Sequence, residues 1–133
     1  MSIIKNLAVC VGLIILVLPC LGQSAWAHYA EGLKLNKPGK YEAATEAFGR
    51  AVEAYIDKEA SDSVGFSYVW VGINHVELKH VEEARRAVDA AMEVYEASSK
   101  TNTELYYDIL SLEARLELVA GNPDKARPIM LHG

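Results

Sequence analysis

The chain has 133 residues, with 13 Lys and Arg against 18 Asp and Glu, and a formal net charge of −5 at pH 7. This balance argues against a nucleic-acid-binding protein, because nucleic acids are held largely by clustered basic side chains that neutralise phosphates, and Arg85-Arg86 is the only adjacent basic pair. The length suits a single domain.

The first 27 residues have the composition of a secretory signal peptide. Lys5 is their only charged residue, an apolar stretch follows it, and Ala25-Trp26-Ala27 supplies small residues of the kind that a signal peptidase requires. We therefore expect a signal helix over residues 1–27, cleavage before His28, and an exported protein of residues 28–133 that is periplasmic or secreted.

Two other interpretations of this segment remain open. An uncleaved membrane anchor through residues 6–22 is one, because the uncharged run is long enough to cross a bilayer, and lipid attachment at Cys20 is the other. Cys10 and Cys20 are the only cysteines. Residues 28–133 therefore have no thiol for a disulfide, a zinc site or nucleophilic catalysis.

The rest of the chain is predicted to be all-α. Between Tyr41 and Lys58, for example, Ala44, Phe48 and Ala51 recur at three- and four-residue intervals, which is typical of an amphipathic helix. Equivalent patterns predict helices, in chain order, over residues 28–36, 41–58, 61–78, 81–98, 101–121 and 123–133. No strand alternation of useful length accompanies them.

Four signals predict where these helices begin and end. Ser61-Asp62-Ser63 offers N-cap oxygens, and Thr101 with Glu104 has the spacing of a capping box. Pro123 suits the first position of a helix. Pro128 follows five residues later, where a proline removes a hydrogen bond, so we expect a kinked or shortened last helix.

One four-residue pattern recurs three times: a small residue, an Ala twelve positions later, a bulky apolar residue after four more, and a small residue after another three. Small residues let antiparallel helices approach to about 8–10 Å, and the bulky residue is expected to fill the space before the next hairpin. Self-similarity of this kind predicts stacked helical hairpins. The pattern comprises Gly32, Ala44, Phe48 and Ala51; Gly72, Ala84, Val88 and Ala91; and Ala114, Ala126, Met130 and Gly133.

These positions resemble the tetratricopeptide repeat family, which has a small residue within the first helix, a Gly and an aromatic residue at the turn, and Ala and bulky residues in the second helix. The matching residues are Gly32, Leu35, Gly39, Tyr41, Ala44, Phe48 and Ala51; Tyr68, Val71, Gly72, Ala84, Val88 and Ala91; and Leu110, Ala114, Gly121, Ala126 and Met130. The resemblance implies a right-handed superhelix of about three antiparallel hairpins, over residues 28–60, 64–99 and 103–133.

The chain departs from the family in three ways. Its repeats are 40 and 42 residues apart, against about 34 in the family. Pro123 replaces the aromatic residue of the third repeat, and Glu113 and Glu117 occupy positions that are usually apolar. Ordinary packing of a helical bundle is the alternative explanation, since Ala is common on any buried helix face.

In this family the first helices of successive repeats line a concave surface that binds a peptide or protein. The resemblance therefore implies a groove with an apolar centre and polar residues that fix orientation. Its expected residues are Tyr29, Leu33, Asn36, Phe66, Val69, Ile73, Glu77, Ser111 and Arg115.

The sequence offers no carrier for catalysis. His75 and His80 are five residues apart across a predicted turn, and none of the four histidines forms the i, i+4 pair typical of a metal site on one helix. Acidic pairs such as Glu113 and Glu117 are expected on exposed faces. We predict no enzyme activity, no catalytic residues, no cofactor and no metal.

The function expected from the sequence is that of an exported adaptor that binds a protein or peptide, with no nucleic-acid partner and a membrane contact only if the N-terminal segment is uncleaved. Two alternatives remain. The protein could be a self-associating structural component of the cell envelope, hence a homo-oligomer, or it could bind a small apolar ligand between its hairpins.

Overall fold

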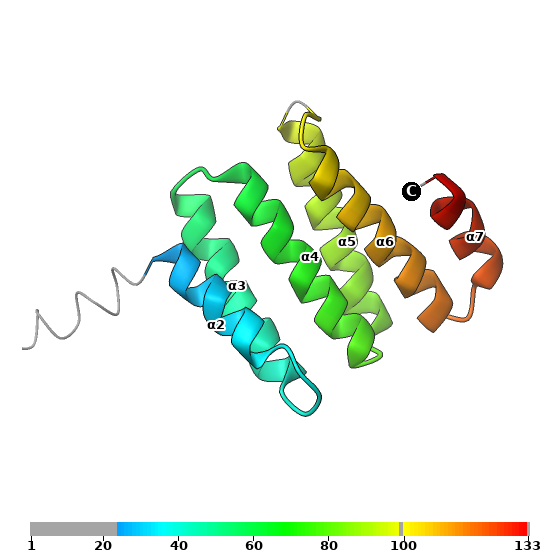
Figure 1. The fold of residues 1–133 in the computed structure, drawn as a ribbon, viewed down its shortest axis with the longest axis horizontal. Helices are drawn as coiled ribbons and strands as arrows, with labels where there is room; N and C mark the ends of the chain where they lie inside the picture. Colours follow the sequence, from blue (N-terminus) through cyan, green and yellow to red (C-terminus); the bar gives the residue numbers. More distant parts are fainter. Residues whose placement is uncertain (1–23, 99, 133) are drawn as a thin grey trace, which may run out of the picture.

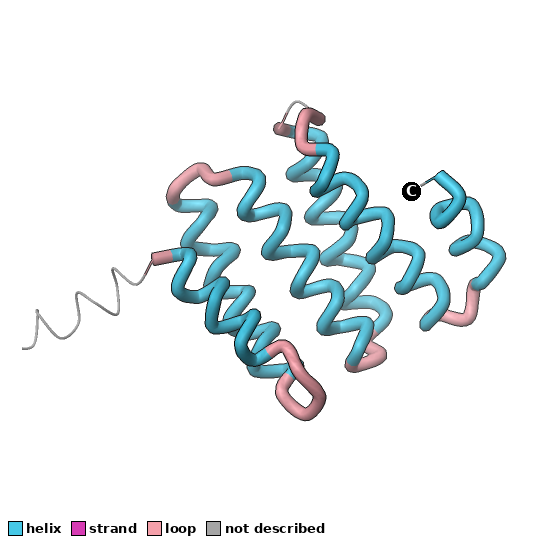
Figure 2. Tube along the Cα trace, viewed as in Figure 1, coloured by secondary structure: helices cyan, strands magenta, loops and turns pink. Residues whose placement is uncertain are grey.

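The computed structural model describes residues 24–98 and 100–132, and this part of the chain forms six helices and no strand. Figures 1 and 2 show the helices joined by short loops. The predicted all-α fold class is confirmed. The helices are α2 (Ala25–Leu35), α3 (Tyr41–Asp57), α4 (Ser61–Glu77), α5 (Val81–Ala97), α6 (Thr103–Val119) and α7 (Pro123–His132).

The helices pair in chain order as α2 with α3, α4 with α5, and α6 with α7, and the hairpins are joined by contacts of α3 with α4 and of α5 with α6. In Figure 1 the first helices of the three hairpins, α2, α4 and α6, are ranged across the front, with α3 and α5 behind them. Helices α4 and α6 also touch directly. The seam between these two helices is where the site described below lies.

The repeated small positions are buried, as the pattern predicts. Ala44, Ala84 and Ala126 have no exposed surface, and Phe48 is also fully buried. Phe48 stacks on Trp70 of the next hairpin with ring centroids 5.5 Å apart, so its predicted role between hairpins is confirmed. Met130 is 56% exposed, so the same prediction is wrong there, and Gly133 lies outside the described residues.

Gly32 and Gly72 lie closest to bulky side chains rather than to Ala44 and Ala84, the alanines that follow them in the repeated pattern. A Cβ on Gly32 would lie 2.7 Å from the Phe48 ring, and one on Gly72 would lie 2.5 Å from Leu112 of α6. The small residues are therefore needed to admit a large side chain. In the second hairpin that side chain comes from the next repeat.

Two predictions about helix starts are wrong, and the predicted stop at Pro128 does not occur, although α7 is shorter than α6 as expected. Ala60 caps α4 without a side-chain bond, and Asn102 replaces the predicted capping box by accepting from the Leu105 N–H at 3.0 Å. Helix α7 continues past Pro128 to His132. The proline removes a bond to the carbonyl of Asp124, a residue exposed enough for water to take its place.

The N-terminal helix extends further back than predicted. Helix α2 begins at Ala25, which is 1% exposed, and the Ser24 hydroxyl accepts from the Ala27 N–H at 3.1 Å. The predicted cleavage point before His28 therefore falls inside α2. Residues 1–23, which carry the rest of the predicted signal helix or anchor, lie outside the described residues.

Candidate functional site

A hollow of about 290 Å³ lies between α4 and α6. Both helices present residues at three- and four-residue intervals, the spacing that places side chains on one helix face. The residues that line it are Val69, Trp70 and Ile73 from α4, and Asp108, Ser111, Leu112 and Arg115 from α6.

Four of the nine predicted groove residues meet in this hollow. Val69, only 4% exposed, forms part of its floor, Ile73 is half-buried, and Ser111 and Arg115 are exposed along its edge. Their helical spacing explains why the sequence could place them together.

The other five predicted residues lie outside the hollow. Tyr29 borders it indirectly, because its hydroxyl accepts a hydrogen bond from Trp70 Nε1 at 2.8 Å. Phe66 packs against the core, Leu33 is 39% exposed, and Asn36 caps the end of α2.

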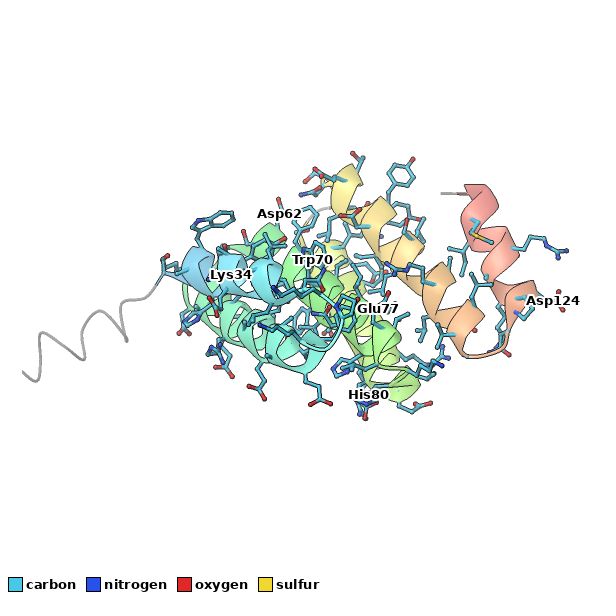
Figure 3. All side chains as sticks on the ribbon, turned by 60° about the horizontal axis from the view of Figure 1, so that its bottom comes forward. Lys34, Asp62, Trp70, Glu77, His80 and Asp124 are labelled. Carbon is cyan, nitrogen blue, oxygen red and sulfur yellow. The ribbon has the colours of Figure 1, made fainter. Side chains whose placement is uncertain are left out.

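Glu77, the ninth predicted residue, forms an ion pair with Arg115, with 2.7 Å between Oε1 and Nη2. Together they border an adjoining hollow that also includes Leu118 and Val119. In Figure 3, Trp70 lies near the middle of α4 and Glu77 lies closer to the turn that carries His80. The pair links α4 to α6 beside the main hollow.

Sequence reasoning missed three residues of the hollow: Trp70, Asp108 and Leu112. Asp108 is one helical turn before Ser111, and Leu112 one turn before Arg115, so helix periodicity could have found both. Trp70 carried no such signal. Its indole both lines the hollow and stacks on Phe48, and helix periodicity does not distinguish these two roles.

The charges of the hollow are unevenly compensated. Arg115 is paired with Glu77, whereas neither Asp108 nor Glu104 takes part in an ion pair among the described residues. Burial, followed by repulsion from Glu104, raises the pKa of Asp108. Burial is also the main cause that raises the pKa of Tyr29, and the carboxylates of Asp108 and Glu104 raise it further.

A second apolar hollow of about 290 Å³ lies elsewhere, near the turn between α3 and α4, and is lined by Ile56, Val64 and Val94 among others. None of the predicted groove residues lines it. Its similar volume makes it a useful control surface for experiments on the hollow between α4 and α6.

His75 and His80 meet across the turn between α4 and α5, with their Nδ1 atoms 3.3 Å apart. This contact was not predicted from the sequence. One ring donates and the other accepts, and burial, followed by the neighbouring His80, lowers the pKa of His75. No group of three or more His, Cys, Asp and Glu side chains suited to a metal occurs in the described part of the chain.

The predicted exposure of Glu117 is wrong. The residue is 5% exposed, and its side chain accepts from Arg85 Nη1 at 2.7 Å and from the Asn122 amide at 3.1 Å. These two donors compensate the buried charge, and the hydrogen bond from Arg85 is the main cause that lowers the pKa of Glu117. The residue thus joins α5, α6 and the turn before α7, which is a structural role.

No protein-family model, curated protein or solved structure matches the chain. Among the helices formed by residues 24–98 and 100–132, none has the length and apolar character to cross a membrane.

Proposed function

We propose that this protein is an exported helical-repeat adaptor that binds a protein or peptide segment in the hollow between α4 and α6. The observation that carries the proposal is that this hollow gathers four of the groove residues expected from the tetratricopeptide-like pattern. The proposal includes the finer fold assignment, a tetratricopeptide-like superhelix whose first helices form the binding face.

The size of the hollow favours a peptide side chain over a whole small molecule. Ligand pockets usually enclose about 300–1,000 Å³ and cover most of their ligand. This hollow is at the lower limit, about 290 Å³, and it is open along its polar edge at Ser111 and Arg115. One apolar side chain of a longer segment would fill it while the rest of the segment lay across the surface.

Site-specific photo-crosslinking in the producing cells tests the proposal. A photoreactive phenylalanine analogue is placed at Ile73 or Ser111, and at Ile56 in the control hollow. We expect discrete adducts from the first two positions that are absent from the third. Adducts that form equally at all three positions, or at none, would count against this binding face.

Self-association is a second candidate function, because apolar side chains are exposed on the last hairpin. Leu118 is 48% exposed, Val119 41% and Met130 56%. Sedimentation of the protein over a range of concentrations tests this candidate. A strict monomer would remove it, whereas a dimer that dissociates on Leu118→Glu substitution would support it.

Export is also part of the proposal, and the N-terminus of the protein isolated from cells tests it. A start at His28 would support cleavage at the predicted point, although α2 would then lose its Ser24 cap and the buried Ala25. A chain that still begins at Met1 would support the anchor formed by residues 6–22 instead.

A further inference from the structure

We propose that the segment bound between α4 and α6 carries a Lys or Arg two to four residues from a branched apolar or aromatic side chain. This inference rests on the proposed function and specifies the chemistry of its partner. The apolar side chain enters the hollow and the basic side chain reaches the carboxylates of α6.

The floor of the hollow defines the apolar anchor. Val69 and Leu112 are 4% and 1% exposed, and Ile73 is half-buried beside them. A hollow of about 290 Å³ accommodates one Leu, Ile or Phe side chain. Because Val69 and Leu112 are already buried, the apolar surface left to cover is mainly that of the partly exposed Trp70 and Ile73, and covering it supplies binding energy through the hydrophobic effect.

The charge of the anchor's neighbour follows from what remains uncompensated. Arg115 is held by Glu77 at 2.7 Å, so it offers little to an acidic peptide. Asp108 lines the hollow, Glu104 lies one helical turn away from it, and neither has an ion-pair partner in the described residues. A basic side chain would relieve the repulsion between these carboxylates, whereas an acidic one would increase it.

The aromatic wall supports the same choice. The Tyr29 hydroxyl accepts a hydrogen bond from Trp70 Nε1 at 2.8 Å, which helps to fix the indole beside the hollow. The faces of Tyr and Trp rings also attract cations. The indole of Trp70 borders the hollow, so an alkyl-ammonium or guanidinium group there gains a cation–π contact.

Helix geometry sets the spacing of the two side chains. Along α6, Leu112 is four residues from Asp108 and eight from Glu104, distances of about 6 Å and 12 Å at 1.5 Å per residue. An extended peptide advances about 3.3 Å per residue. Two residues of peptide therefore span the first distance and four residues span the second.

The experiment selects peptides from a phage-displayed random library on the full chain. It then measures the dissociation constant of one selected peptide for the wild type, Ile73→Glu, Asp108→Asn and Glu46→Gln. Glu46 is exposed on α3, so its variant controls for the loss of a carboxylate away from the hollow. Circular dichroism confirms that each variant is folded.

We expect selected peptides to share a basic and an apolar residue at the stated spacing. Asp108→Asn should weaken binding about tenfold, which corresponds to about 1.4 kcal/mol, and Ile73→Glu should abolish it, while Glu46→Gln has no effect. Raised salt should also weaken binding to the wild type.

Two different failures can be distinguished. Selected peptides without a basic residue, whose affinity responds to Ile73→Glu but not to Asp108→Asn, would overturn the inference and leave the proposed function intact. Selection of no peptide, or of peptides indifferent to Ile73→Glu, would overturn both.

Discussion

The two junctions between neighbouring hairpins are formed by different types of side chain. Between the first and second hairpins, the Phe48 and Trp70 rings stack at 5.5 Å with an interplanar angle of 6°. Tyr29 meets the Phe48 ring edge-on at 5.4 Å and accepts the bond from the Trp70 indole. Three rigid aromatic side chains therefore fix this aromatic junction.

The buried core of the junction between the second and third hairpins is aliphatic, and Tyr95 of α5 and Tyr106 of α6 adjoin it with ring centroids 5.1 Å apart. Its buried cluster combines Val88 of α5 with leucine and isoleucine side chains of α6, of which Leu112 fills the space above Gly72. Two inter-helix ion pairs, Arg85 with Glu117 and Arg115 with Glu77, frame this aliphatic junction.

The same repeated pattern therefore gives one rigid junction and one adaptable junction. An aromatic ring is rigid, whereas a leucine side chain can change rotamer. The hollow lies between the two junctions, with Trp70 as a fixed wall and Leu112 as an adjustable floor. We infer that the wall sets the position of a bound segment and the floor adapts to its anchor.

The largest expected effect comes from adding a methyl group at Gly32, and the same change at Gly72 is its comparison. Gly32→Ala brings a Cβ to 2.7 Å from three atoms of the Phe48 ring, and we expect a loss of about 2–3 kcal/mol in the free energy of unfolding. Gly72→Ala meets the flexible end of Leu112 at 2.5 Å, so its loss should be less than about 1 kcal/mol because the higher helix propensity of Ala offsets it. Urea unfolding followed by circular dichroism measures both.

Gly49→Ala is the matched control for this pair. Gly49 lies within α3 with no atom within 4 Å of an added Cβ, so the variant should be more stable by about 0.5–1 kcal/mol. Equal losses at Gly32 and Gly72 would contradict the distinction between a rigid and an adaptable junction.

The next effect separates two adjacent arginines. Arg85→Ala leaves the buried Glu117 carboxylate with the Asn122 amide as its remaining donor, and we expect a loss of about 1.5–2 kcal/mol because hydrogen bonds to charged groups are strong. Arg86 is 74% exposed and lies 3.6 Å from Glu83, so Arg86→Ala should cost less than about 0.5 kcal/mol. Thermal unfolding distinguishes the two variants. Similar losses of stability in both would show that Arg85 does not stabilise the aliphatic junction.

The smallest effect is a dependence on pH. The Arg85 hydrogen bond lowers the pKa of Glu117 below its ordinary value of 4.5. The stability that this carboxylate contributes is therefore present above pH 4.5 and is lost as the pH falls through the pKa of the folded state. The raised pKa values of Asp108 and Glu113 act in the opposite direction.

Comparison with Glu117→Gln isolates this contribution. The difference in unfolding free energy between the wild type and the variant should be largest near neutral pH and should shrink below pH 4.5. A difference that is unchanged down to pH 3 would show that the charge of Glu117 does not stabilise the fold.

Helical periodicity predicted the helices well, because most apolar positions in each segment face a neighbour. The connections were harder. Glu59, Lys79 and Lys100 adopt positive φ angles of 55°, 61° and 57°, which glycine usually supplies, so the sequence marked only the turns with Gly39 and Gly121. The caps at Ala60 and His80 likewise carry no side-chain bond.

Contacts between residues far apart in the chain could not be predicted from the sequence. Glu117 is buried because Arg85, on another helix, reaches it, and nothing local signals that contact. The structure brings Val69, Ile73, Ser111 and Arg115 together in one hollow, and helical spacing had placed them on the same faces of α4 and α6. Asp108 was missed although periodicity could have found it, whereas Trp70 was missed because the rotation of α4 about its axis depends on packing.

The central claim is that the hollow between α4 and α6 binds a peptide, and methyl NMR of the full chain tests it most directly. The probe is a synthetic Ser/Gly peptide with one Lys two residues before one Leu, added to millimolar concentration. We predict shifts of the Val69, Ile73 and Leu112 methyl signals and none of Ile56 or Val94, which line the control hollow. Shifts confined to Ile56 and Val94, or no shifts at all, would contradict the claim.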